Sequence, residues 1–183
     1  DRFYLYGFFI LVTAFILRLI HISTIYHSPN SDALVYWSMA TGKIDIFTIT
    51  ASGYPFLLKI LILLSSPNSF FFFLFANVIF GTLTILLTIV IARKLFDRRI
   101  ALLAGLILAL YRPLILSCGL MLTETFSSFL MTAVFYCLVL LLNRFSPLPI
   151  MMLVPSTVWL LHVRPNSATL LLLFPLVGFL SAN

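Results

Sequence analysis

The sequence predicts an all-α protein that crosses a membrane several times as a polytopic transmembrane helical bundle. Hydrophobic residues make up 62% of the chain and charged residues only 9%, whereas soluble domains are roughly 45–50% apolar and about a quarter charged. The mean hydropathy is +1.18. The basic residues behind the net charge of +6 lie between long apolar stretches, and they do not form the polar, basic face that nucleic-acid binding requires. We therefore expect the lipid bilayer, and no nucleic acid, as a partner.

The first predicted span covers about residues 4–25. Its length matches the roughly 20 residues of a transmembrane helix, and it lacks the small-residue cleavage pattern of a signal peptide. Arg18 and His21 interrupt it in the half nearer its end. An arginine at this depth faces an anionic headgroup, extends outward to the interface or pairs with a helix carbonyl, and the sequence leaves these alternatives open.

Residues 26–69 form a loop that we expect to lie outside the bilayer and to carry short interfacial helices. Pro29 ends the apolar stretch, and Ser31 or the residue before it caps a short helix. Asp32 lies in the first turn of this helix, where the helix dipole favours a carboxylate, and Tyr36 follows one turn later on the same face. Asp32 therefore either has a chemical function or only complements the dipole.

A second short helix of the loop is predicted from Pro55 to Ser66. Proline suits the first position of a helix, but 12 residues are too few to cross a bilayer, which takes roughly 20. We expect this helix to lie in the interface or on the bundle, with the Lys59 side chain extended toward the headgroups.

The remaining apolar stretches predict five further spans, giving about six in total, at about residues 70–92, 100–122, 125–142, 147–163 and 167–183. A basic loop at 93–99 separates the first two of these, and the positive-inside rule places it in the cytoplasm. The chain begins at Asp1 and the last stretch stops at Asn183. We expect it to be the N-terminal part of a transmembrane domain whose C-terminal remainder is missing.

This orientation brings three ionisable residues from separate segments to the external face. Asp32 lies in the first loop, Glu124 in the turn between the third and fourth predicted spans, and Arg164 at the outer end of the fifth. Ionisable groups at the membrane surface or within it are costly and indicate function, although Glu124 also suits the first turn of a helix. His21, His27 and His162 lie near the same face. They leave a divalent cation open as a cofactor, but no spacing is typical of metal ligands, and we predict no metal site.

Several short motifs recur in the same order as in a known family. They are Leu17-Arg18-Leu19, Ser31-Asp32-Ala33 with Tyr36, Gly53-Tyr54-Pro55-Phe56, Leu122-Thr123-Glu124-Thr125 and Arg164-Pro165-Asn166. With them the chain resembles the N-terminal part of the membrane glycosyltransferases of family 39, the GT-C-fold enzymes of the protein O-mannosyltransferase and aminoarabinose-transferase type.

The resemblance implies an integral membrane glycosyltransferase (GT39, GT-C fold) that takes a sugar from a polyprenyl-phosphate donor. It implies transfer with inversion, on the non-cytoplasmic face, to an acceptor hydroxyl of a protein, lipid or polysaccharide. The first-loop acid of the family matches Asp32, and the acid after the third span matches Glu124. We expect a multi-pass protein of the bacterial inner membrane with its site on the periplasmic side.

The chemistry of glycosyl transfer assigns roles to these residues. An inverting reaction with an oxocarbenium-like transition state needs a carboxylate that accepts the proton of the attacking hydroxyl, and we assign this role to Asp32. The phosphate leaving group needs positive charge, for which Arg164, Arg18 and Lys59 are candidates. Glu124 is expected to orient the acceptor or Asp32, or to hold a cation, and Tyr36 to contact substrate.

Two other classes of function remain open. A transporter or lipid flippase also uses external carboxylates and intramembrane arginines, although such proteins tend to show internal repeats and broken helices near the midplane. No internal repeat is visible in the chain. The third alternative is a non-catalytic membrane subunit or a decayed gene fragment.

Overall fold

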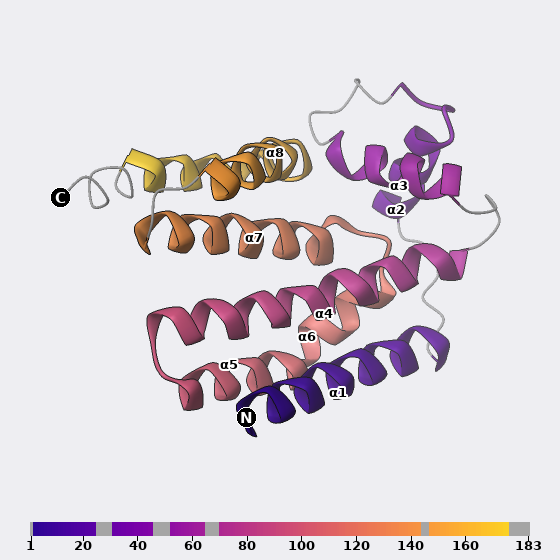
Figure 1. Cartoon of the computed structure of the whole chain (residues 1–183). Coiled ribbons are helices and arrows are strands. Elements are labelled where there is room, and N and C mark those ends of the chain that lie inside the picture. The colour runs from indigo at the N-terminus through magenta and orange to yellow at the C-terminus, as the bar shows by residue number, and fades with distance from the viewer. Residues whose placement is uncertain (1, 25–30, 46–51, 65–69, 144–146, 176–183) are drawn as a thin grey trace.

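The computed structural model describes residues 2–24, 31–45, 52–64, 70–143 and 147–175, and within these ranges it is helical without a strand. The elements are α1 (Arg2–Thr24), α2 (Ser31–Ala40), α3 (Gly53–Leu64), α4 (Phe70–Leu95), α5 (Arg98–Leu110), α6 (Arg112–Leu116), the 3-10 helix η1 (Ser117–Gly119), α7 (Thr123–Asn143), α8 (Pro147–Val163) and the 3-10 helix η2 (Pro165–Leu172). The long helices lie beside one another, and α2 and α3 gather at one end of them (Figure 1).

Three helices are long and apolar enough to cross a membrane: α1, residues 71–95 of α4 and residues 123–142 of α7. The bent pair formed by α5 and residues 112–119 adds a fourth if it is one span. These helices indicate a membrane protein. The six predicted spans are not confirmed, because α8 has only 17 residues and residues 165–172 form a 3-10 helix where the sixth span was expected to begin. Residues 176–183 of that span lie outside the described residues.

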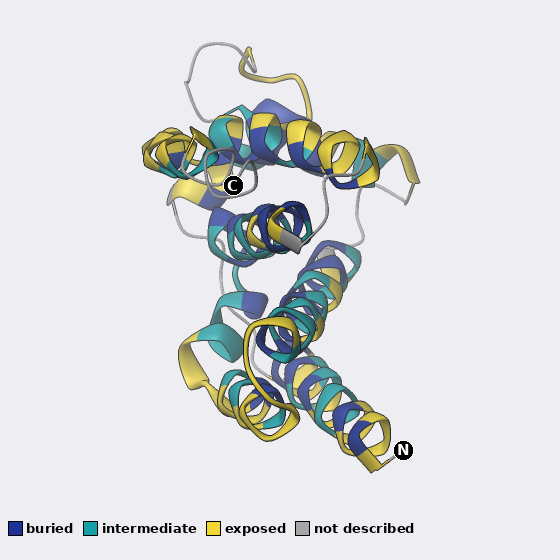
Figure 2. Cartoon of the chain, turned by 60° about the vertical axis from the view of Figure 1, so that its left-hand side comes forward, coloured by how far each residue is buried: buried dark blue, intermediate teal, exposed yellow. Residues whose placement is uncertain are grey.

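The described helices form three hydrophobic clusters, and α4 contributes to each of them. On one side α4 packs against α1 and α5, and on the other it packs against α7, which in turn carries α8. Dark-blue buried residues face these interfaces, and yellow exposed residues cover the outer sides (Figure 2). Many of the exposed side chains are large and apolar, among them Phe8, Leu103, Ile107 and Met151. Such an apolar exterior suits contact with lipid, since backbone groups are already paired within the helices.

The predicted third span, expected as one helix over about 100–122, is wrong in its shape. Helix α5 ends at Leu110, Tyr111 is extended with φ −69° and ψ 105°, and the following segment is bent by 56° from α5. Pro113 causes the break, because it has no N–H for the fourth preceding carbonyl and its ring would clash with that carbonyl. Pro113 is the signal of the break in the sequence, whereas hydropathy alone predicts an unbroken span.

The two ends of the bundle differ in charge. At one end the start of α1 meets the end of α4, where Arg93 donates a hydrogen bond of 3.0 Å to the Tyr4 hydroxyl. The opposite end holds α2, α3, the start of α7 and the end of α8 (Figure 1). The basic segment 93–99 therefore lies at the opposite end of the long helices from Asp32, Glu124 and Arg164, as the predicted topology requires.

Candidate functional site

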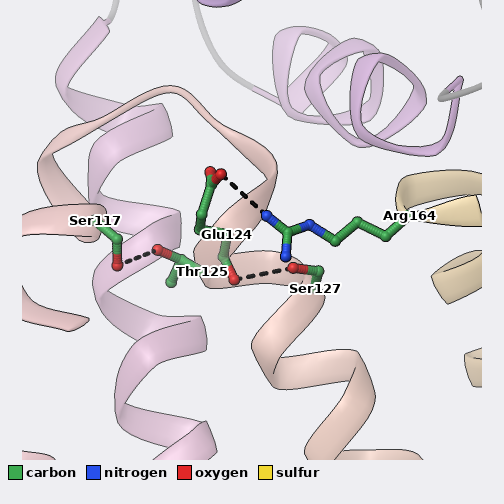
Figure 3. A network of polar contacts seen from close by, with 5 residues as sticks. All are labelled: Ser117, Glu124, Thr125, Ser127 and Arg164. Atoms are coloured by element: carbon green, nitrogen blue, oxygen red, sulfur yellow. Dashed lines mark hydrogen bonds and ion pairs between the residues drawn. The ribbon is translucent and has the colours of Figure 1, made fainter. Parts of the chain in front are cut away.

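Glu124 and Arg164 form an ion pair at the end of the bundle that also holds α2 and α3. The distance from Arg164 Nη2 to Glu124 Oε1 is 3.1 Å, and the side chains are 47% and 46% exposed. Figure 3 shows the arginine extending from beyond α8 to the first turn of α7. The second carboxylate oxygen of Glu124 is buried and has no hydrogen-bond partner within the described residues. It is therefore a buried acceptor without a donor in the described part of the chain.

The position of Glu124 is fixed by hydrogen bonds around the start of α7. Thr125 donates a hydrogen bond of 3.1 Å to Ser117 Oγ of η1, and Ser127 donates one of 3.1 Å to the Glu124 carbonyl (Figure 3). Asn77 of α4 donates a hydrogen bond of 2.9 Å to the Leu120 carbonyl. These hydrogen bonds are partly buried and favour a single geometry of the backbone that carries the carboxylate.

The position of Arg164 follows from the end of α8. The Arg164 N–H still donates to the Leu160 carbonyl at 2.7 Å, but its backbone is extended with φ −140° and ψ 93°. Pro165 follows directly and begins η2. Arg164 is extended because a residue before a proline is disfavoured in the helical region. The side chain consequently leaves the helix at its end and extends toward Glu124.

Tyr36 of α2 lies within the electrostatic influence of all three predicted ionisable residues. Burial raises its pKa, the negative charges of Asp32 and Glu124 raise it further, and the positive charge of Arg164 opposes them. Asp32 itself is exposed in the first turn of α2. The structure thus brings residues from α2, α7 and the α8–η2 junction to one region, as the sequence predicted.

Tyr54 is a residue of this region that the sequence analysis named only within a motif. Its ring packs edge-on against that of Tyr36, with 5.4 Å between the centroids, and it is only 1% exposed. Burial raises its pKa well above the ordinary tyrosine value, while a hydrogen bond with Asn77 lowers it. The phenol is therefore neutral at physiological pH. A tyrosine next to proline at the start of a helix is no signal of burial, so only the tertiary structure could identify it.

A cavity of about 400 Å³ lies between α3 and α8. Phe56, Val158, Trp159 and His162 are among its lining residues, and His162 precedes Arg164 by two positions in the chain. Trp159 donates a hydrogen bond of 3.0 Å to the Gly53 carbonyl and packs edge-on against Phe126. Most of the cavity's lining is apolar. The helix α8 that forms one of its walls leads directly to Arg164 of the ion pair. Sequence reasoning missed the cavity, because its walls come from segments about 100 residues apart.

Two residues predicted to bind substrate, Arg18 and Lys59, are not part of the Glu124–Arg164 ion pair. Arg18 is fully buried in α1, where it donates hydrogen bonds to the carbonyls of Ala14 at 3.0 Å, Ala109 at 3.3 Å and Leu108 at 3.3 Å. It thus satisfies carbonyls at the break after α5, which is the pairing with helix carbonyls that the sequence left open. Lys59 is exposed on α3, and within the described ranges no ion pair joins it to Glu124.

The part of the chain that the structure describes holds no group of three or more His, Cys, Asp and Glu residues arranged to bind a metal. His21 is buried, and His162 Nδ1 lies 2.8 Å from the Val158 carbonyl. His27 lies outside the described residues. A divalent cation therefore remains an open prediction without a ligand set.

Comparison of the chain with protein-family models, with curated proteins and with solved structures found no match. The family resemblance noted in the sequence accordingly stays a hypothesis, which the geometry of the site must support.

Proposed function

We propose that this protein is a membrane glycosyltransferase that transfers a sugar from a polyprenyl-phosphate donor to an acceptor hydroxyl with inversion. The observation that carries the proposal is the Glu124–Arg164 ion pair beside Tyr36 and Asp32 at one end of an apolar bundle. A carboxylate that accepts a proton and a guanidinium that binds phosphate are the groups such a reaction needs.

In the proposed reaction, the exposed Asp32 carboxylate accepts the proton of the acceptor hydroxyl. The hydroxyl oxygen forms a bond to the anomeric carbon as the bond from this carbon to the phosphate oxygen breaks. The polyprenyl phosphate leaves with the electron pair, and the Arg164 guanidinium stabilises its charge. Glu124 holds Arg164 through Oε1 and orients the acceptor.

The apolar cavity between α3 and α8 supports a lipid-linked donor. A polyprenyl chain needs an apolar surface that begins close to the phosphate-binding group. Phe56, Val158 and Trp159 provide such a surface, and α8 continues from it directly to Arg164. A water-soluble nucleotide sugar has no apolar chain that would bind this surface, so we favour a polyprenyl phosphate as the donor.

The test is transfer of label from a panel of radiolabelled polyprenyl-phosphate sugars, in membranes that contain the full-length protein. We expect one donor to be used, and we expect Arg164→Gln to reduce transfer strongly by loss of phosphate binding. Lys43→Gln, which removes an exposed cation after α2, serves as the matched control and should keep the rate. If a folded protein transfers label from none of the donors, the proposal is wrong.

The break in the α5–α6 segment favours transport as the second candidate function. Broken helices that meet near the midplane are typical of transporters, and this one is bent by 56°. The Arg18 guanidinium donates hydrogen bonds to carbonyls at the break. These bonds indicate a structural role for Arg18 at the break. Movement of fluorescent lipid-linked sugars across the bilayer of reconstituted vesicles, with no chemical transfer, would favour this second function or a non-catalytic subunit of a transporter.

A further inference from the structure

A second cavity, of about 500 Å³, lies between α1 and α4 at the end of the bundle opposite the ion pair. Its walls are apolar and include Gly7, Leu11, Leu86 and Val90, and two basic residues, Arg93 and Lys94, line the same cavity. It faces the outside of the bundle next to side chains that are themselves exposed, among them Phe8 at 62%. An apolar groove with a basic rim on a membrane protein suits an amphiphile with a negatively charged head.

The Arg93 guanidinium is held at this rim by the start of α1. It donates a hydrogen bond of 3.0 Å to the Tyr4 hydroxyl, and its central carbon lies 4.8 Å from the Phe3 ring centroid and 5.1 Å from that of Tyr4. Two aromatic rings and one hydroxyl therefore hold the arginine in place. One hydroxyl engages one of the guanidinium N–H groups, and the fork can offer others to a phosphate.

The charge of the surroundings is strongly positive. Residues 93–99 contain four basic residues and one acid, a net charge of +3. That acid, Asp97, accepts hydrogen bonds of 2.8 Å from the backbone N–H groups of Arg99 and Ile100 as the N-cap of α5. It forms part of the helix cap, so Arg93 and Lys94 are available to an anion.

We propose that this groove binds a phospholipid with an anionic headgroup from the adjacent leaflet. The phosphate contacts Arg93 and Lys94, and an acyl chain lies along the wall formed by Gly7, Leu86 and Val90. Basic pockets between transmembrane helices attract anionic lipids, and each cation near the surface contributes to the attraction. The site is separate from the Glu124–Arg164 pair, so the proposal does not depend on glycosyl transfer.

The experiment is native mass spectrometry of the full-length protein titrated with phosphatidylglycerol or with phosphatidylcholine of the same acyl chains. We expect a preference for phosphatidylglycerol, and the double variant Arg93→Gln/Lys94→Gln should weaken its binding by about fivefold for each charge removed. The matched control is Arg98→Gln/Arg99→Gln, which removes the same charge from the same segment outside the groove and should keep most of the binding.

Val90→Phe tests the apolar part with every charge kept. We expect it to fill the groove and to reduce binding of phosphatidylglycerol to the level of phosphatidylcholine, with helical content and melting temperature unchanged. Val90→Phe also tests lipid binding in the groove if the double variant does not fold. Equal loss in both double variants, no preference between the lipids, binding unchanged in Val90→Phe, or a second copy of the chain in place of lipid would each overturn the proposal.

Discussion

Arg18 shows how one residue can hold two helices together. It is fully buried, and its guanidinium joins α1 to the Ala109 carbonyl, which Pro113 leaves without a helical donor, and to the Leu108 carbonyl, which also accepts the Tyr111 N–H. An unpaired buried carbonyl costs about 1–3 kcal/mol. The residue therefore stabilises the bent segment rather than only carrying a charge.

We predict that Arg18→Met lowers the stability of the protein by about 1–3 kcal/mol, because it leaves the Ala109 carbonyl without a donor. Arg18→Lys should recover part of the loss, since its ammonium reaches fewer carbonyls than the guanidinium fork. Thermal unfolding in detergent measures both. Arg112→Met, an exposed arginine at the break, is the control. A melting temperature for Arg18→Met equal to that of the control would refute the structural role.

The Glu124–Arg164 pair should affect activity far more than stability. Because both side chains are half exposed, the pair contributes about 0–1 kcal/mol to folding. We predict that Glu124→Gln and Arg164→Gln each reduce transfer about 100-fold or more, as loss of electrostatic stabilisation does. The double variant should be little worse than either single one, because the two side chains act together. Losses that multiply in the double variant would show that the residues act independently.

Tyr54 should make the stability of the protein depend on pH in the alkaline range. Burial raises its pKa above the ordinary value of 10.0, so the folded state keeps the phenolic proton when the unfolded chain releases it. Stability is therefore fully present below pH 10 and falls as the pH rises above it. Tyr54→Phe should flatten this fall, and melting temperatures between pH 8 and 11 measure it. Tyr111→Phe controls for loss of an exposed hydroxyl; the same alkaline slope in wild type and Tyr54→Phe would contradict the account.

At the scale of elements, the close approach of α3 and α8 depends on Gly53. A Cβ atom at this position would lie 2.8 Å from the His162 carbonyl carbon and 2.8 Å from the Val163 nitrogen. Both are backbone atoms, which cannot turn aside as a side chain can. The cavity that we assign to the polyprenyl chain lies along this contact.

We predict that Gly53→Ala separates α3 from α8 and destabilises the protein by about 1–3 kcal/mol through overpacking. It should also break the hydrogen bond from Trp159 to the Gly53 carbonyl and shift the tryptophan emission. Gly7→Ala is the matched control, because its Cβ would only touch Leu102 Cδ2 at 4.0 Å. If the two variants melt at the same temperature, the contact between α3 and α8 is looser than described.

The sequence predicted the long helices well and the breaks poorly. The spans expected at 4–25, 70–92 and 125–142 correspond to Arg2–Thr24, Phe70–Leu95 and Thr123–Asn143, because long apolar stretches have few other conformations. The break at Tyr111 depends on a single proline, and the Ala109 carbonyl freed there accepts a hydrogen bond from Arg18, which lies 91 positions earlier in the chain. An average of hydropathy over a window of residues shows neither the single proline nor the distant hydrogen-bond partner.

At the scale of the whole molecule, topology predicted part of the site. Counting basic residues placed Asp32, Glu124 and Arg164 at one end, and the structure pairs Glu124 with Arg164 at that end. The counting could not predict the apolar cavity or the burial of Tyr54, because both depend on how α3 docks on the bundle. It also left open whether Arg18 faces a headgroup or pairs with helix carbonyls.

The central claim is that the end of the bundle with Asp32, Glu124 and Arg164 performs glycosyl transfer. The most direct measurement compares the initial rate of sugar transfer by Asp32→Asn with that of the wild type, using the donor found in the panel. Asp45→Asn, which replaces another exposed acid of the same loop, is the control. We predict that Asp32→Asn lowers the rate by about 100-fold or more, as loss of a general base does, while the control keeps it. A rate for Asp32→Asn equal to that of the wild type would contradict the account.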